Sequence, residues 1–359
     1  VKSISKKYNV YFLVPNGVAE ERLKKYGKVI SVTGLSKFDN SKIGYYRGFR
    51  WLVLVREIYF LIPTFFSIFK IKKKIKNLKL IHFNEITLIP TIYLFRLYFK
   101  IPFILHCRIL FNRNNFVSSF IIKFIKKNIS QIIAIDNDVK NSLPRNLEIK
   151  VIRNILNIKK INTFNRFKKK NVLNIGFLGS FLKYKGIEDL VKVFNKLKAN
   201  NHMINLYIAG DYVRNENKFL KFFGITNEVS KNLIYNKNIV NLGHIDNLDK
   251  FYSKIDILCF PSYLNALGRQ VFEAALYQIP SIVCLKNNSS DSFINKKTGL
   301  SFKIPGDQKK LEDLILFFYF NKKKIKIMGN SAKKLVEKNF DIKKNLKSLN
   351  KIYSSLIQN

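Results

Sequence analysis

Short apolar runs alternate along the whole chain with longer stretches of helical periodicity. In the first half, helical stretches at 19–26, 87–99 and 117–127 separate the runs. Strands connected by helices are typical of α/β folds with parallel sheets. The runs predict strands over 9–15, 28–34, 78–83, 102–107, 131–136 and 149–154, and in the second half over 172–179, 204–210, 238–243, 256–262 and 280–285.

The 359 residues form two halves with the same alternation. A chain of this length is expected to divide into two domains. The polar, basic segment NIKKINTFNRFKKKN at 157–171 looks like the linker between them. We therefore predict one domain over 1–160 and a second over 165–339.

The longest apolar segment is IYFLIPTFFSIF, residues 58–69, and it is followed by a lysine-rich stretch. It is too short for a membrane span, which needs about 20 residues, and Pro63 interrupts it. Aromatic side chains beside five lysines in 58–76 favour an interfacial helix on an anionic leaflet, although a core helix with a solvated basic tail fits equally well. No secretory signal precedes this region, and YFLVP at 11–15 is too short to be one. The sequence thus predicts a cytoplasmic protein, peripheral on the inner face of the cytoplasmic membrane.

Charge adds a second constraint, because 65 Lys and Arg outnumber 23 Asp and Glu, for a net charge of +42. Such a surface attracts anionic membranes, polyanions or phosphorylated substrates. Nucleic acid is not the expected partner, since Arg is scarce and no RRM, KH or helix-turn-helix signature is present. Cys107, Cys259 and Cys284 show no metal-binding spacing and are expected to be buried free thiols in a reducing compartment.

Ligands of doubly wound folds bind beyond the carboxyl ends of the strands. After the strand at 172–179, GSFLKYKGIEDL places Lys185 and Gly186 at a helix start, where free N–H groups favour a phosphate. After the strand at 256–262, PSYLNALGRQVFEAA places Gly268 before a helix that carries Glu273. A third polar loop, KNNSSDSFINKKTGL at 286–300, follows the next strand. Each feature alone is explained by an ordinary turn or helix start, but together they mark one edge of one sheet.

In order and spacing, the second half resembles the GT-B glycosyltransferases of the group 1 type, which are retaining enzymes that use nucleotide-diphosphate sugars. The segment GFLGSFLKYKGIEDLV resembles the family's Gly-Arg-Leu…Lys-Gly loop, LYIAGD its Gly-Asp strand end, and the stretch at 261–275 its Glu-x7-Glu motif. The segments QIPSIV and KKTGLSFKIPGD are similar to its two following motifs.

The first half resembles the family more weakly. PNGVAEERL is similar to its Gly-Gly-x-Glu loop and supplies Gly17, and IPFILHC puts His106 at the acceptor-facing position. The resemblance also implies a C-terminal helix over 340–359 that crosses back onto the first domain.

Three motifs depart from the family pattern. Asn265 replaces the first Glu, which is expected to contact the transferred sugar, and Ser180 replaces a phosphate-binding Arg. Asn287 and Asn288 replace the Gly-Gly of the diphosphate loop. These departures leave open a GT-B protein that has lost catalysis and acts as a binding partner.

The resemblance implies two Rossmann-like, doubly wound parallel-sheet domains facing a central cleft. It implies transfer of a sugar from a nucleotide-diphosphate donor, without cofactor or metal, to a saccharide hydroxyl. The acceptor is expected to be lipid-linked and to belong to O-antigen, capsule or lipopolysaccharide assembly. Catalysis is assigned to His106, Lys185, Asn265 and Glu273, and donor binding to Gly17, Gly179, Ser180, Lys185, Gly210, Gly243, Asn265, Ala266, Leu267, Gly268, Arg269, Glu273 and Asn288.

Other functions remain open at this stage. The segment Asp136-Asn137-Asp138 has the form of a metal-binding motif of a different transferase fold, but a polar strand-end loop explains it better. An RNA-binding protein that uses the basic surface is a less favoured alternative, as is an epimerase on the same fold.

Overall fold

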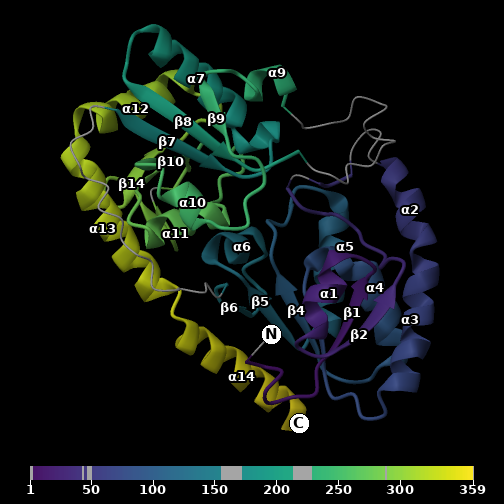
Figure 1. Ribbon diagram of the computed structural model, residues 1–359. Coiled ribbons are helices and arrows are strands. Elements are labelled where there is room, and N and C mark those ends of the chain that lie inside the picture. Colours follow the sequence, from purple (N-terminus) through teal and green to yellow (C-terminus); the bar gives the residue numbers. More distant parts are fainter. Residues whose placement is uncertain are drawn as a thin grey trace. The chain divides into compact units, whose positions relative to one another are not determined.

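The computed structural model describes residues 3–42, 44–46, 51–154, 172–212, 229–287 and 289–358 (Figure 1). The chain divides into two compact units, which we call unit 1 (Val1–Ile155 with Asp341–Asn359) and unit 2 (Leu156–Phe340). The linker predicted at 157–171 lies outside the described residues.

Unit 2 is built on a six-stranded sheet in which every neighbouring pair is parallel. Its spatial order, β14-β11-β10-β7-β8-β9, is that of the dinucleotide-binding α/β fold. The chain direction across the sheet reverses between β7 and β10, the point at which such folds bind ligands. The strands are β7 (Leu173–Leu178), β8 (Ile204–Ala209), β9 (Ile239–Asn241), β10 (Ile257–Phe260), β11 (Ser281–Cys284) and β14 (Gly299–Phe302).

Helices of unit 2 cover this sheet because each has one apolar face. In α7 (Ile187–Ala199) the side chains of Ile187, Leu190, Phe194 and Leu197, three or four residues apart, are fully buried. The opposite face is polar and carries the Lys192–Glu188 pair at 3.0 Å. The other elements are η3 (Lys183–Lys185), α9 (Lys231–Ile234), α10 (Asp249–Tyr252), α11 (Arg269–Leu276), α12 (Gln308–Phe320), α13 (Lys322–Asn339), β12 (Ser289–Ser290) and β13 (Phe293–Ile294).

Unit 1 contains a four-stranded parallel sheet of order β3-β4-β5-β6 and a separate parallel pair, β1-β2. Ile30 of β2 packs into the same hydrophobic core as Phe83 and Phe103, so the two sheets share one core. Parallel α/β architecture is thus confirmed in both units. The strands are β1 (Tyr11–Pro15), β2 (Lys28–Val32), β3 (Ile81–Phe83), β4 (Phe103–Cys107), β5 (Gln131–Ala134) and β6 (Ile149–Val151). The helices between these strands include α1 (Val18–Lys24), η2 (Ile86–Leu88), α4 (Ile89–Tyr98), α5 (Phe116–Asn128) and α6 (Asn137–Ser142).

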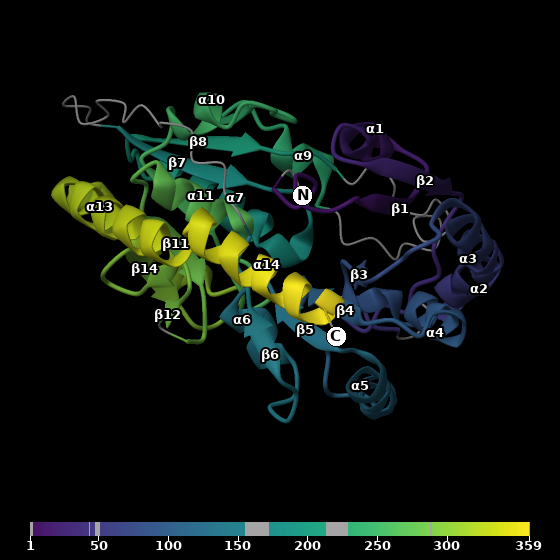
Figure 2. The same ribbon diagram turned by 90° about the horizontal axis from the view of Figure 1, so that it is seen from below.

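The C-terminal helix α14 (Ile342–Gln358) packs on the second face of the four-stranded sheet. Ile352 and Tyr353 join Ile104, Ile133 and Ile152 in one apolar cluster, and Figure 2 shows the end of α14 beside β4 and β5. Both faces of the sheet are therefore covered, as parallel sheets require.

Helices α2 (Val53–Tyr59) and α3 (Leu61–Lys74) follow one another along one side of unit 1 (Figure 1). The helical hydrogen bonding is interrupted between them at Phe60, because Pro63 has no N–H to donate to the carbonyl four residues earlier. The buried side of α3 contains Thr64 and Ser67 beside Ile68, whereas its exposed side is apolar from Ile62 to Phe69 and basic beyond that. This segment therefore matches neither a plain core helix nor the usual polar-outside pattern.

Truncating Ile352 is expected to destabilise unit 1. Its side chain is 4% exposed, and Ile352→Ala removes buried methyl groups and leaves a cavity, which costs about 2–5 kcal/mol of unfolding free energy. Lys351→Ala on the exposed side of the same helix should change it by less than about 0.5 kcal/mol. Urea unfolding measures both values, and equal midpoints for the two variants would show that α14 does not stabilise the unit.

Candidate functional site

The two loops predicted to carry chemistry in unit 2 lie in contact at the carboxyl ends of the central strands. Tyr263 of the loop after β10 donates its backbone N–H to the carbonyl of Tyr184 in η3, after β7, at 2.9 Å. These strands flank the point at which the strand order reverses. The structure thus brings together the Lys185 and Asn265–Gly268 segments that the sequence predicts separately.

Gly186 allows this close approach. Its φ is +75°, a left-handed conformation, and a Cβ at this position would lie 2.1 Å from the carbonyl oxygen of Pro261. Any other residue would push the two loops apart, because a carbonyl of the backbone cannot give way easily.

Lys185 is a half-buried cation at the end of η3. Its Nζ lies 5.3 Å from the ring centre of Tyr184 and 5.4 Å from that of Phe260. Within the described residues no carboxylate lies within 4 Å of the ammonium, and burial lowers its pKa. Aromatic faces stabilise a cation without neutralising it, so the charge stays available to an anion.

Helix α11 begins beside this loop without a side-chain cap. Gly268 occupies the N-cap position with no side-chain acceptor for the first N–H groups. Free N–H groups and the positive end of the helix dipole attract phosphate. A second positive feature thus follows the same strand end.

Glu273 lies on the buried side of α11, with 7% of its surface exposed. Arg269 donates from Nε to its Oε1 at 2.6 Å, and the Tyr252 hydroxyl lies 3.4 Å from Oε2. Burial raises the pKa of this carboxyl, and the Arg269 charge opposes that rise. The structure thus joins Arg269 and Glu273, two residues that the sequence assigns to donor binding.

Asn265 has a structural reason for being an amide. Its φ is +51°, a region in which Asn is far commoner than longer side chains, and its Oδ1 accepts the backbone N–H of Lys286 at 2.6 Å. The side chain therefore ties the loop after β10 to the end of β11. Ala266 and Leu267 continue this loop, and Leu267 packs against the hydrophobic core.

The predicted glycines of unit 2 end three consecutive strands. Gly179 follows β7, Gly210 follows β8 and Gly243 lies just after β9. Gly210 donates its N–H to the Gly243 carbonyl at 2.8 Å, and a Cβ on Gly210 would lie 2.0 Å from the Gly179 carbonyl oxygen. Ser180 follows Gly179 at this edge, whereas Asn288 lies outside the described residues.

The two predicted residues of unit 1 lie in different settings. Gly17 lies two residues after β1 and is the N-cap of α1, with a φ of +144°. His106 is 7% exposed within β4, and its ring centre lies 5.4 Å from that of His82. Burial lowers the pKa of His106 to about 2, so its imidazole is neutral near pH 7. Its Nε2 is buried and has no hydrogen-bond partner among the described residues.

His82 connects this pair to the C-terminal helix. Its Nδ1 lies 2.5 Å from the hydroxyl of Tyr353 on α14, and burial lowers its pKa to about 4. Sequence reasoning missed His82 and also Arg108, which lies two residues beyond His106. The available signal was a polar residue directly after two strands, Asn84 and Arg108, and a third, Asn154, three residues after β6.

No group of three or more His, Cys, Asp and Glu side chains suited to a metal ion occurs in the part of the chain that the structure describes. Asp136 of the Asp-x-Asp segment is the N-cap of α6 and accepts the Val139 N–H at 2.7 Å. Over the same described ranges, we find no helix with the length and apolar character needed to traverse a bilayer.

Comparison with known proteins identifies related chains. The family model "Glycosyl transferases group 1" matches residues 158–335. The capsular polysaccharide biosynthesis glycosyltransferase CapM of Staphylococcus aureus is 23% identical over 184 residues, or 51% of this chain and 46% of CapM. An uncharacterized glycosyltransferase of Methanocaldococcus jannaschii, MJ1069, is 26% identical over 249 residues, or 66% of this chain and 61% of that protein. The chain thus spans less than two thirds of these relatives.

Solved structures match over nearly the whole chain. HepE of Anabaena, in complex with UDP and glucose, has a TM-score of 0.67 at 16% identity and covers 96% of this chain and 92% of its own. The sucrose-phosphate synthase of Thermosynechococcus elongatus has a TM-score of 0.68 at 17% identity, over 93% and 84% of the two chains. At such identities the likeness shows the fold alone, and it confirms the predicted GT-B class of two Rossmann-like domains.

Acidification is expected to weaken unit 1 through its buried histidines. The folded pKa values, about 4 for His82 and about 2 for His106, lie below the usual value of 6.5. Below pH 6.5 the unfolded chain therefore binds protons that the folded chain does not. The contribution of the two histidines to the free energy of unfolding is fully present above pH 6.5. Below that pH it falls by about 1.4 kcal/mol per pH unit for each histidine, until the folded state is protonated as well.

Urea unfolding between pH 7 and pH 5 measures this slope. His106→Gln should flatten it, and His244→Gln, at an exposed position, is the control variant. Identical slopes for wild type and His106→Gln would contradict the assignment.

Proposed function

We propose that this chain, whose residues 158–335 belong to the glycosyl transferases group 1 family, transfers a sugar from a nucleotide-diphosphate donor to a hydroxyl of a saccharide acceptor with retention. The observation that carries the proposal is Lys185, a cation without an acidic partner among the described residues, at the strand-order reversal of unit 2. The similarity to CapM, a glycosyltransferase of capsular polysaccharide biosynthesis, supports surface polysaccharide assembly as the pathway.

The donor's diphosphate is assigned to the Lys185 loop and the start of α11. As the bond from the sugar C1 to the diphosphate oxygen breaks, negative charge accumulates on the diphosphate. Lys185 and the N–H groups after Gly268 stabilise that charge without reorganising. A new bond then forms from C1 to the acceptor oxygen on the same face, and the acceptor proton passes to the departing phosphate. HepE was solved with UDP-glucose, which makes UDP-sugars the first donors to test.

Glu273 and Asn265 are proposed to recognise the rest of the donor. A carboxylate can accept two hydrogen bonds from a ribose diol, and Arg269 orients this one. Asn265 is proposed to contact the sugar through its amide N–H groups, since its oxygen is already bonded to Lys286. His106 is buried and neutral, so its proposed acceptor contact is a neutral hydrogen bond.

Lys185→Met is expected to weaken donor binding roughly tenfold to hundredfold, the value of one hydrogen bond to a charged group. Lys183→Met is the matched control, because Lys183 is exposed in the same turn and loses the same charge. Thermal shift against UDP-, GDP-, ADP- and CDP-sugars identifies the nucleotide, and titration then gives both affinities.

Two results would go against this assignment. Equal affinities for the two variants would remove Lys185 from the donor site. A protein that no nucleotide-sugar stabilises would instead be a GT-B binding partner without catalysis, the alternative that Asn265 and Ser180 leave open.

A lipid-linked acceptor is proposed because unit 1 exposes an apolar surface beside lysines. On α3 the side chains of Ile62, Phe66 and Phe69 are 57%, 57% and 49% exposed. Exposed aromatic side chains continue onto α4, where Tyr98 contacts Phe69 at 6.2 Å between ring centres. The lysines that follow are Lys70, Lys72, Lys73, Lys74 and Lys76.

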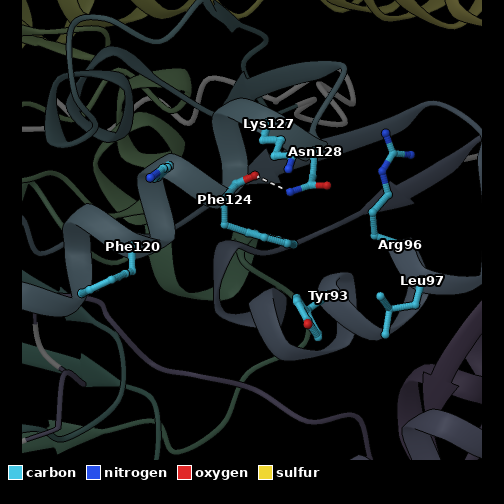
Figure 3. Close-up of a pocket in the computed structure, with 8 residues that line it drawn as sticks. Tyr93, Arg96, Leu97, Phe120, Phe124, Lys127 and Asn128 are labelled. Carbon is cyan, nitrogen blue, oxygen red and sulfur yellow. Dashed lines mark hydrogen bonds between the residues drawn. The ribbon is translucent and has the colours of Figure 1, made fainter.

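A groove between α4 and α5 extends this surface (Figure 3). Its volume is about 350 Å³, and Tyr93 and Phe120 on its walls are 54% and 70% exposed. Basic side chains lie beside them, an arrangement that suits the boundary between lipid headgroups and acyl chains. The lining residues are Tyr93, Arg96, Leu97, Phe120, Lys123, Phe124, Lys127 and Asn128.

Vesicle flotation tests this membrane association. Wild type should float with anionic vesicles at low salt and much less at high salt, because lysines attract the leaflet electrostatically. Burying one Phe contributes about 1.5–3 kcal/mol, so Phe66→Ser with Phe69→Ser should lower the partition coefficient more than tenfold. Phe320→Ser is the control, since Phe320 is 71% exposed on unit 2. Failure of the wild type to bind anionic vesicles at low salt would exclude the proposed membrane association.

A further inference from the structure

Three polar side chains converge at the carboxyl edge of the four-stranded sheet in unit 1. Asn84 follows β3, Arg108 follows β4 and Asn154 follows β6. Arg108 donates from Nε to Asn84 Oδ1 and from Nη1 to Asn154 Oδ1, both at 2.9 Å. The two amides thus hold the guanidinium at the edge where parallel sheets bind their ligands.

The charge of Arg108 is not neutralised by this arrangement. Both acceptors are neutral amides, and the described residues include no ion pair to Arg108. The nearby carboxylate of Glu85 accepts the backbone N–H of Ile86 at 2.7 Å. Its charge opposes the burial that lowers the pKa of Arg108, but no ion pair within 4 Å joins the two side chains. His106 and His82, on the same face, are neutral because burial lowers the pKa of each. Charges that are taken out of water are usually paired directly, whereas among the described residues this half-buried guanidinium has a carboxylate nearby but none within ion-pair distance.

The guanidinium also has donors to spare. Of its five N–H groups, two are used by Asn84 and Asn154, and in the described part of the chain no residue accepts from Nη2. The remaining N–H groups lie in one fixed plane and match the spacing of phosphate oxygens. Orientation by amides preserves the positive charge that a carboxylate would cancel.

We infer that Arg108, held by Asn84 and Asn154, binds a phosphate group of the acceptor. This inference rests on the proposed function, which assigns the donor's own phosphates to Lys185 in unit 2. It specifies that the acceptor is phosphorylated, either as a lipid-linked saccharide or as a soluble sugar phosphate.

The Nε–H resonance of Arg108 reports directly on this site in the full-length protein. Inorganic phosphate, titrated in 150 mM NaCl, should shift that resonance saturably. The resonance of Arg113, an exposed arginine of the following loop that donates to the Asn141 carbonyl, should drift without saturating. Arg108→Lys and Arg113→Lys assign the two signals. A saturable shift at both arginines, or at neither, would overturn the inference.

Two variants separate phosphate binding from folding. Arg108→Lys should weaken phosphate binding about tenfold, because one ammonium replaces a planar fork. Asn154→Asp keeps Arg108 and nearly the same shape but supplies a competing carboxylate, and it should also weaken binding about tenfold. Unchanged affinity in Asn154→Asp, with an unchanged unfolding midpoint, would contradict the inference.

The source of the phosphate follows from two further probes. Vesicles with farnesyl phosphate, compared with farnesol vesicles, test a lipid phosphate, and glucose 1-phosphate tests a soluble one. Saturation of the Arg108 signal by either phosphate supports the inference and identifies its source, whereas equal effects of farnesyl phosphate and farnesol overturn it. A saturable Arg108 site without nucleotide-sugar binding would refute the proposed function alone, and the reverse result would refute this inference alone.

Discussion

Burial of parallel strands on both faces is the constraint on which this protein depends. Every residue of β4, β10 and β11 is buried, and helices cover both faces of each main sheet. A polar group buried there without a partner costs free energy, and Nε2 of His106 in β4 is such a group among the described residues. Most residues assigned to function therefore lie in the loops at the strand ends, as Lys185, Gly268 and Arg108 do. His106 within β4 and Glu273 on α11 are the exceptions among the assigned residues.

Both units keep a positive charge available by holding it with neutral groups. In unit 2 the ammonium of Lys185 lies over the rings of Tyr184 and Phe260. In unit 1 amide oxygens hold Arg108. Arg269 is treated differently, because its partner Glu273 is a carboxylate that cancels its charge. The distinction separates cations suited to bind an anionic ligand from one that orients a neighbouring side chain.

Strand positions were predictable from the sequence because buried parallel strands are continuous apolar runs. All eleven predicted strands are present, since each run is bounded by polar or glycine residues. The loops of unit 2 were predictable for a related reason: Lys185 and Gly268 stand next to recognisable helix starts. That β1 and β2 form a sheet of their own had no local signal.

What the sequence could not show depends on contacts between distant residues. Arg108 donates hydrogen bonds to Asn84 and Asn154, which lie 24 and 46 positions away in the sequence. Asn265 accepts a hydrogen bond from the backbone N–H of Lys286, 21 positions later. The exposed apolar side of α3 was equally hidden, because Thr64 and Ser67 are buried through bonds to the backbone and to Ser36. Hydropathy alone would have assigned those two residues to the surface.

The exposed apolar surface of α3 also bears on how copies of the protein behave toward one another. Uncovered phenylalanines favour self-association, while a net charge of +42 keeps molecules apart in dilute buffer. Salt shortens the range of that repulsion to about 10 Å at 0.1 M, and it leaves the hydrophobic attraction in place. The same lysines therefore keep copies of the protein apart and attract it to anionic surfaces. Salt that releases the protein from such a surface also removes its protection against aggregation.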